Sequence, residues 1–299
     1  MRVKLPPAWT LVELFVVANL GFLAIDVYIA HSINAFELSP EWIPVVYSAL
    51  APLLLLAALA TGGFAPRSGY PIVEPASSRR QLVGRGIGMM VGYAALAVGI
   101  GGMLLHLQSH FFEEQSIRSL VYTAPFVAPL AYAGLGLLLI LDRMVDSDSL
   151  EWLRWVTILA MGGFVGNFVL TLADHAQNGF FNPAEWIGVG AAAFAIAFLA
   201  MVVVLPFDRR LLLAASVLML LESLVGVTGF ALHFTANLHR PGSNLWERFL
   251  YGAPVFAPLL FPNLALLAAI AIHSLWSRSA KLSVIQEEES LDRRASSSA

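Results

Sequence analysis

The sequence predicts an all-α, polytopic membrane protein with eight transmembrane helices arranged as two parallel four-helix repeats. Three observations predict this fold class: the composition, eight long apolar runs, and a similarity between the two halves of the chain. Of the 299 residues, 58% are hydrophobic and only 12% are charged, whereas a soluble domain carries about 25% charged residues. The mean hydropathy of +0.75 agrees with a chain that lies largely in lipid.

A helix needs about 20 apolar residues to cross a hydrocarbon layer roughly 30 Å thick. The chain offers eight such runs, at 10–31, 42–62, 83–106, 119–141, 152–174, 186–206, 210–233 and 249–275. Strand-like alternation, which a transmembrane barrel requires, is absent from them. The first run carries Glu13 and Asp26 and lacks a cleavage site, so we expect it to be retained rather than removed as a signal peptide. The loop 62–81 and the tail 283–299 are predicted to be solvated and irregular.

Lysine and arginine predict the orientation, because short loops rich in these residues stay on the cytoplasmic side. Of the 17 such residues, 14 lie before the first run, after the last, or in the loops that follow even-numbered runs. Arg118, Arg240 and Arg248 lie on the other side. Both termini are therefore expected to be cytoplasmic, in a bacterial inner membrane.

The two halves of the chain share several stretches of sequence. "HSINAFELSPEWI" at 31–43 aligns without a gap with "HAQNGFFNPAEWI" at 175–187, "GIGGMLLH" at 99–106 resembles "GVTGFALH" at 226–233, and "YTAPFVAPL" at 122–130 resembles "YGAPVFAPL" at 251–259. Four helices per copy give both copies one orientation and a pseudo-twofold axis along the membrane normal. The expected domains are a first repeat (1–143), a second repeat (144–278) and a disordered cytoplasmic tail (279–299).

Each copy carries two prolines one helical turn apart, Pro125 with Pro129 and Pro254 with Pro258. Proline inside a helix removes an amide donor and clashes with the preceding turn. We therefore expect helices 119–141 and 249–275 to bend at these positions. The freed carbonyl groups either serve only the shape of the bundle or line a cavity or ion site.

Six of the seven histidines fall at or beyond the predicted outer ends of the helices, and His31, His106, His175 and His233 occupy matching places in the two halves. A histidine at a helix C-terminus interacts favourably with the helix dipole, but capping does not require imidazole. Imidazole is distinguished by coordination and by titration near neutral pH. These four residues are therefore the candidate ligands of a cofactor, either b-type haem or a transition metal.

A second candidate is a bare metal site. "HLQSH" places His106 and His110 four residues apart, a spacing that brings two imidazoles to one helical face. Glu113 follows closely, and His239 is the nearest counterpart in the second half. The second half does not repeat the i, i+4 pair, so the sequence leaves open whether the two halves share one site.

Polar residues beside the histidines are candidates for orienting them or for carrying protons, because ionisable groups within a bilayer are costly. They are Asp26, Asn34, Glu41, Asp174, Asn178 and Glu185, while Glu13 and Glu222 lie within other runs. The alternative for the asparagines is a left-handed cap, and for Glu41 and Glu185 a favourable position at a helix start. Trp42 and Trp186 fit an interfacial aromatic belt.

The residue pattern leaves three classes of function. The first is a haem- or metal-binding protein that transfers electrons to or from a quinol or a partner subunit. The second is a proton-coupled transporter of ions or small molecules, and the third is a non-catalytic scaffold or pigment-ligating subunit of a membrane complex. The chain has no cysteine, which excludes disulfides, iron–sulfur clusters and thiolate metal sites. It also lacks a basic patch for nucleic acid, a nucleophile elbow, a phosphate-binding loop and a dinucleotide fingerprint.

Overall fold

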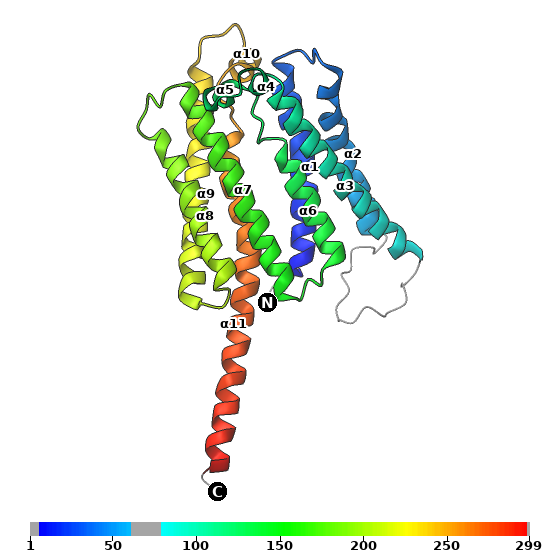
Figure 1. The fold of residues 1–299 in the computed structure, drawn as a ribbon, viewed down its shortest axis with the longest axis vertical. Coiled ribbons are helices and arrows are strands. Elements are labelled where there is room, and N and C mark those ends of the chain that lie inside the picture. The colour runs from blue at the N-terminus through cyan, green and yellow to red at the C-terminus, as the bar shows by residue number, and fades with distance from the viewer. Residues whose placement is uncertain (1–5, 61–78, 298–299) are drawn as a thin grey trace.

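The computed structural model describes residues 6–60 and 79–297, and every regular element within these ranges is helical (Figure 1). Seven helices of the described part are long and apolar enough to cross a membrane. They are α1 (Ala8–Ser32), α2 (Trp42–Ala60, after the short 3-10 helix η1, Ser39–Glu41), α3 (Arg79–Leu107), α7 (Leu150–Gln177), α8 (Glu185–Val204), α9 (Arg209–His239) and α11 (Leu260–Ser297). Large apolar side chains such as Leu53, Leu220 and Leu224 stand more than half exposed on these helices. Contiguous apolar surface of this kind fits contact with lipid.

Side chains at several helix starts satisfy backbone amides that have no partner within the helix. The hydroxyl of Ser149 accepts a hydrogen bond from the Trp152 amide at the start of α7. The carboxylate of Asp208 accepts from the amides of Arg210 and Leu211 at the start of α9. These caps explain why the two helices begin where they do.

The two proline-containing stretches are broken rather than bent, which corrects the expectation of continuous helices at 119–141 and 249–275. In the first, α5 (Ile117–Tyr122) gives way to a non-helical segment, and α6 (Leu130–Met144) begins directly after Pro129. In the second, α10 (Leu245–Leu250) is followed by turns, the 3-10 helix η2 (Ala257–Leu259) and then α11. Proline is accepted without cost in the first turn of a helix, where no amide donor is needed. In the interior it removes a hydrogen bond and clashes with the preceding turn, a cost that α2 bears once, at Pro52.

Helix α6 is therefore short. Its 15 residues span about 22 Å at 1.5 Å per residue, less than the hydrocarbon thickness. The fourth apolar run, 119–141, is thus not, by itself, a helix long enough to cross the membrane. The helix α4 (Phe111–Glu114) is shorter still and lies in the connection between α3 and α5.

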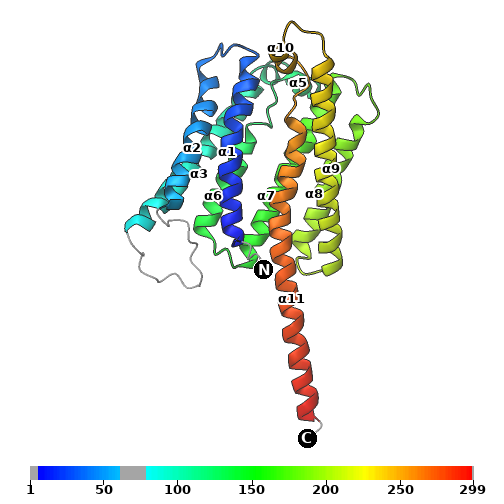
Figure 2. The same cartoon turned by 180° about the vertical axis from the view of Figure 1, so that it is seen from behind.

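The seven long helices and α6 pack as two groups of four, which we name the first unit (α1, α2, α3, α6) and the second unit (α7, α8, α9, α11). In the first unit, α1 and α3 each pack against both α2 and α6. In the second unit, α7 and α9 each pack against both α8 and α11. Helices α1 and α3, and likewise α7 and α9, are therefore diagonal partners across their units. All four finish at one end of the molecule, opposite the end from which α11 projects (Figures 1 and 2); we call it the histidine end.

The two units meet through α1 with α11 and α6 with α7. The amides of Asn19 on α1 and Asn263 on α11 exchange hydrogen bonds across this junction, one of them 3.2 Å long. The short helix α5 packs on α7, and α10 packs on α1. Each unit thus places its short helix against the first helix of the other unit.

Helix α11 continues to Ser297 and projects beyond the bundle (Figure 1), which differs from the expected disordered tail at 279–299. The tail contains leucine, lysine, arginine, glutamine and three glutamates, residues that favour helix strongly. Extending an existing helix also avoids the cost of nucleation. The loop expected to be irregular at 62–81 lies, except for its last residues, outside the described ranges.

Candidate functional site

Two pairs of histidine rings meet at the histidine end. The ring centres of His31 on α1 and His106 on α3 lie 6.2 Å apart with the planes at 68°. Those of His175 on α7 and His233 on α9 lie 6.5 Å apart with the planes at 78°. Because α1 and α3, and α7 and α9, are diagonal partners, each pair of rings spans its unit from one side to the other.

The backbone around His31 fixes the first ring of each pair. The amide of Phe36 donates to the carbonyl of His31, five residues earlier, and the Ala35 amide donates to the Ser32 carbonyl. This is the pattern of a Schellman helix end, which needs left-handed backbone. Ala35 and Phe36 supply it, with φ of 53° and 55°.

The same helix end forms at His175 in the second unit. The amide of Phe180 donates to the His175 carbonyl over 3.1 Å, and Gly179 and Phe180 have φ of 68° and 51°. The expectation of left-handed asparagine caps is wrong, because the left-handed residues follow Asn34 and Asn178 by one and two positions; Asn178 itself has φ of −90°. The asparagines contribute instead through their backbone amides, which donate to the carbonyls of His31 and His175.

An aromatic pair holds each strained turn in place. The ring of Phe36 stacks on Trp42 at 4.0 Å between centres, and that of Phe180 stacks on Trp186 at the same distance. A bulky residue with positive φ is costly, and stacking of this kind offsets part of the cost. The fixed spacing of histidine, phenylalanine and tryptophan in both copies follows from this geometry.

The second ring of each pair contacts the broken stretch of its own unit. The Nδ1 atom of His106 lies 3.1 Å from the carbonyl oxygen of Pro125, and that of His233 lies 2.9 Å from the carbonyl oxygen of Pro254. These carbonyls precede helices α6 and α11 and have no partner within them. The proline breaks therefore supply the acceptors that orient His106 and His233.

All four rings use Nδ1 in this way. Nδ1 of His31 lies 3.0 Å from the Glu41 carbonyl oxygen, and Nδ1 of His175 lies 3.3 Å from the Glu185 carboxylate. A carbonyl oxygen can only accept, so Nδ1 is the protonated nitrogen in His31, His106 and His233. The contact of His175 with Glu185 is at ion-pair distance and favours the same tautomer. In a neutral imidazole the other nitrogen, Nε2, then carries a lone pair. The arrangement presents four Nε2 lone pairs in two places.

Acidic groups accompany both pairs. The Glu41 carboxylate acts electrostatically on His106, and the Asp174 carboxylate acts on His233. Asp174 also lines a small cavity of about 30 Å³ between α7 and the segment around Thr123 and Pro125, room for about two water molecules. Pro125, which accepts from His106, and Asp174, the residue before His175, both line this cavity. The cavity therefore contacts a neighbour of each histidine pair.

Asp26 lies five residues before His31 on α1, where its carboxyl group interacts electrostatically with the Tyr132 hydroxyl. The Tyr132 hydroxyl is 2.6 Å from that of Ser48, and both side chains are buried. The Tyr47 hydroxyl donates to the carbonyl of Val91 over 2.8 Å. These three hydroxyl groups are not among the candidate site residues predicted from the sequence. Their position within otherwise apolar runs could have indicated them.

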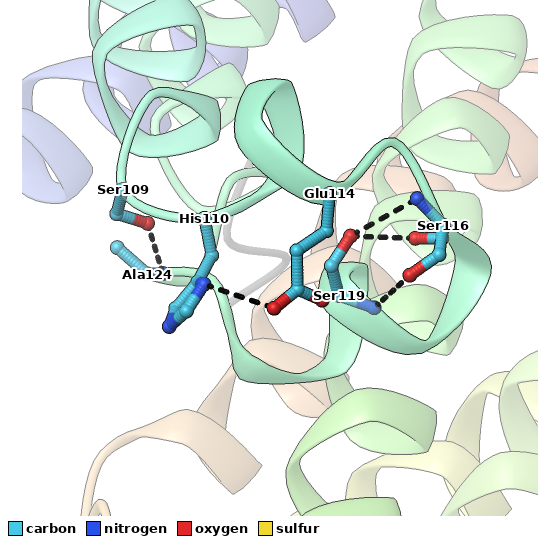
Figure 3. A network of polar contacts seen from close by, with 6 residues as sticks. All are labelled: Ser109, His110, Glu114, Ser116, Ser119 and Ala124. Atoms are coloured by element: carbon cyan, nitrogen blue, oxygen red, sulfur yellow. Dashed lines mark hydrogen bonds and ion pairs between the residues drawn. The ribbon is translucent and has the colours of Figure 1, made fainter.

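The proposed His106–His110 metal pair does not form on one helical face. Helix α3 ends at Leu107 and His110 is the residue before α4, so the i, i+4 argument does not apply. His110 instead lies 4.0 Å from Glu114, near a capping box of Ser116 and Ser119 (Figure 3).

The remaining members of that metal set are dispersed. Glu113 is exposed on α4, and the Nδ1 of His239 contacts the Thr235 carbonyl of its own helix at 2.8 Å. Across the described residues, no group of three or more His, Asp or Glu side chains is placed to hold a metal ion. The two-histidine pairs are thus the positions at which coordination chemistry is available.

No family model matches the sequence, and neither a curated protein nor a solved structure matches it at a significant level.

Proposed function

We propose that the chain is an integral membrane electron-transfer protein that holds one b-type haem between His31 and His106 and a second between His175 and His233. The single observation that carries this proposal is the pairing of the four imidazoles. Each pair joins diagonal helices of a four-helix unit, and bundles of this kind supply axial haem ligands from facing helices.

The ring separation supports a metal between the rings. A metal–nitrogen bond to histidine is about 2.0–2.1 Å, so two imidazoles on opposite sides of one ion have ring centres about 6 Å apart. The separations of 6.2 and 6.5 Å fit this arrangement. The tilt between the rings is compatible with it, since each ligand can rotate about its own bond to the metal.

The Nδ1 contacts support coordination through Nε2. Histidine ligands usually donate their other ring N–H to a carbonyl or carboxylate, which fixes the tautomer and the ring orientation. The carbonyl oxygens of Glu41, Pro125 and Pro254 and the carboxylate of Glu185 supply four such acceptors. The orienting contacts for coordination are therefore already built.

The number of ligands favours haem over a bare ion. Protein-bound zinc takes three or four side-chain ligands, and each pair offers two. Haem iron takes four nitrogens from its macrocycle and needs only axial ligands from the protein. When bound, the haem supplies one-electron transfer; Asp26 and Asp174 then hold protons close to the centres, for exchange with a quinol or a partner subunit.

The two-repeat architecture belongs to the same proposal. The helices of both units pack in the same order, and the Schellman turns, stacked aromatic pairs and histidine–proline contacts occur once in each. We place the broken stretch 117–144 as the eighth crossing. The lysine and arginine distribution puts the histidine end on the non-cytoplasmic side of a bacterial inner membrane.

The test is absorption spectroscopy and metal analysis of the full chain purified from membranes. Two haems per chain are expected. The Soret absorbance should fall by half in His106→Gln and in His233→Gln, and disappear in the double variant. The matched controls His110→Gln and His239→Gln, also at the histidine end, should keep it. A colourless, metal-free protein would overturn the proposal and favour the transporter or the scaffold.

A further inference from the structure

The interior of the second unit contains two buried polar side chains whose polar atoms lack partners within the described structure. Glu222 on α9 is 1% exposed, and neither carboxyl oxygen has a hydrogen-bond partner. Asn167 on α7 is 2% exposed, and its Nδ2 donor is likewise unsatisfied. Buried polar groups are nearly always paired, so each of these exceptions requires an explanation.

Glu222 faces the inside of its unit. One turn later on α9, Gly226 packs so closely on η2 and α11 that an added Cβ would lie 2.6 Å from the Pro258 carbonyl oxygen and 2.8 Å from the Phe261 Cβ. Glu222 belongs to the same buried stripe as Met219 and Gly226. Residues four apart share a helical face, so the carboxyl points between α11 and its neighbour α8.

Asn167 faces the same interior from the opposite side. Four residues before it, Gly163 packs against Leu264 of α11, and four residues after it, Thr171 packs against Gly188 of α8. Asn167 lies between these two contacts and so points between α11 and α8, towards the diagonal helix α9. The two unsatisfied side chains therefore face the axis of the second unit from its two diagonal helices.

The surroundings provide no counter-charge. On α7, α8 and α9 the other described ionisable side chains lie towards the helix ends: Glu151, Arg154, Asp174 and His175 on α7, Glu185 on α8, and Arg209, Arg210, His233 and His239 on α9. On α11 they are His273, which is exposed, and Arg278, which lies 18 residues into the helix. An isolated carboxylate in apolar surroundings is far more costly than a neutral carboxyl group. A bound proton removes that cost.

We propose that Glu222 is a proton-binding site inside the second unit, with Asn167 as the polar group that assists exchange of the proton with water. The carboxyl group binds one proton and releases the same proton. The Asn167 amide assists through water, because no direct hydrogen bond joins the two side chains. Glu222 precedes His233 by 11 residues on α9, about 16 Å along the helix. The site is therefore separate from the histidine pairs and does not rest on haem binding.

The first unit shows that this packing does not need polar groups here. Counting from the matching glycines and histidines, Glu222 aligns with Ala95 and Asn167 aligns with Leu23. Ala95 is fully buried against α6, where an added Cβ at Gly136 would lie 2.9 Å from its Cβ. An apolar pair thus fills the same positions, so the polar pair in the second unit serves something other than the fold.

Labelling with dicyclohexylcarbodiimide tests the proposal, because this apolar reagent modifies protonated carboxyl groups within membranes. The full chain in its membrane is labelled at several pH values and mapped by mass spectrometry. Glu222 should be labelled, the labelling should fall as the pH rises, and sodium at constant ionic strength should not change it. Labelling at this position should be lost in Glu222→Gln. Glu13, which pairs with Arg143, is the internal control and should remain unlabelled.

Thermal unfolding supplies a second readout. Glu222→Ala should fold and be at least as stable as the wild type, because it removes an unsatisfied buried group and reproduces Ala95. Asn167→Leu should fold, and the labelling of Glu222 should be slower in this variant than in the wild type. Absence of label at Glu222 at every pH, suppression of label by sodium, or marked destabilisation by Glu222→Ala would overturn the proposal. Loss of the Soret band would not bear on it.

Discussion

The imidazole of His233 donates from Nδ1 to the carbonyl oxygen of Pro254 over 2.9 Å. The bond joins the end of α9 to the segment that leads into α11, and His106 makes the matching bond to Pro125. Each bond satisfies a carbonyl that the proline break removes from any helical ladder. The same side chain thus closes its unit and, in the proposed function, is also a haem ligand through Nε2.

This dual role predicts that His106→Ala and His233→Ala lower stability even in cofactor-free protein. Each loses the hydrogen bond from its imidazole, and the Pro125 or Pro254 carbonyl keeps only its turn bond from the Ala128 or Ala257 amide. We expect a cost of about 1 kcal/mol. Thermal unfolding of the purified, cofactor-free variants measures the effect. His239→Ala is the control, since that ring bonds only within its own helix; an equal loss there would contradict the prediction.

The histidine end could be predicted from sequence because matching motifs fall at the ends of long apolar runs. The broken helices could not, because an apolar segment has the same composition whether it is helical or extended. The left-handed turn was assigned to asparagine by residue preference, yet Ala35 and Phe36 adopt it. There the stacking of Phe36 on Trp42, a contact six residues along the chain, outweighs the local preference.

The sequence also could not predict the direction in which a side chain of a helix points. Glu222 was recognisable as an ionisable residue within an apolar run, but its isolation depends on how α9 is rotated against α11 and α8. Asn167 and Tyr132 stand out in the sequence only as polar residues within apolar runs. Their burial follows from the packing of four helices, and the apolar runs are too uniformly hydrophobic to predict that rotation.

Close helix packing predicts that Gly99→Ala and Gly226→Ala destabilise the protein. A Cβ at Gly99 would lie 2.6 Å from the Ala133 amide nitrogen, and one at Gly226 would lie 2.6 Å from the Pro258 carbonyl oxygen. Backbone atoms cannot move aside cheaply, so we expect a loss of about 1–3 kcal/mol for each. Gly101→Ala is the matched control on α3, because nothing lies within 4 Å of its Cβ. Chemical unfolding in detergent gives the comparison, and equal effects at positions 99 and 101 would contradict it.

The hydroxyl pair of Ser48 and Tyr132 predicts a non-additive mutant cycle. Tyr132→Phe leaves the buried Ser48 hydroxyl without its 2.6 Å partner, at a cost of about 1–3 kcal/mol. Removing both hydroxyls with Ser48→Ala and Tyr132→Phe should cost less than the sum, because no group is then left unsatisfied. The aligned positions in the second unit, Ala192 and Phe261, already have this composition. Unfolding free energies of the three variants give the coupling, and simple additivity would show that the pair is not coupled.

An exposed pair predicts a local effect of pH. The hydroxyl and amide of Ser243 donate to the Glu247 carboxylate over 2.5 and 3.0 Å, and these bonds lower the pKa of Glu247. A carboxyl whose folded pKa is depressed contributes stability above its unfolded pKa of about 4.3, and this stability is lost as the pH falls through the folded value. Amide exchange of 243–248, corrected for intrinsic rates, should therefore accelerate in acid. Glu247→Gln should show fast exchange at neutral pH and little further change.

The buried ion pair of Glu13 and Arg143 predicts the largest single effect. The two side chains are each 3% exposed and lie 2.5 Å apart, on α1 and α6 of the first unit. Glu13→Leu leaves the arginine charge buried without this partner, at a cost of about 3–5 kcal/mol. Replacing both residues by leucine should recover most of that loss, because a well-packed apolar pair needs no desolvation of charge. Glu151→Leu, at an exposed position on α7, should change the unfolding temperature little. If the double variant were as unstable as Glu13→Leu, the pair would be required for more than cancelling a buried charge.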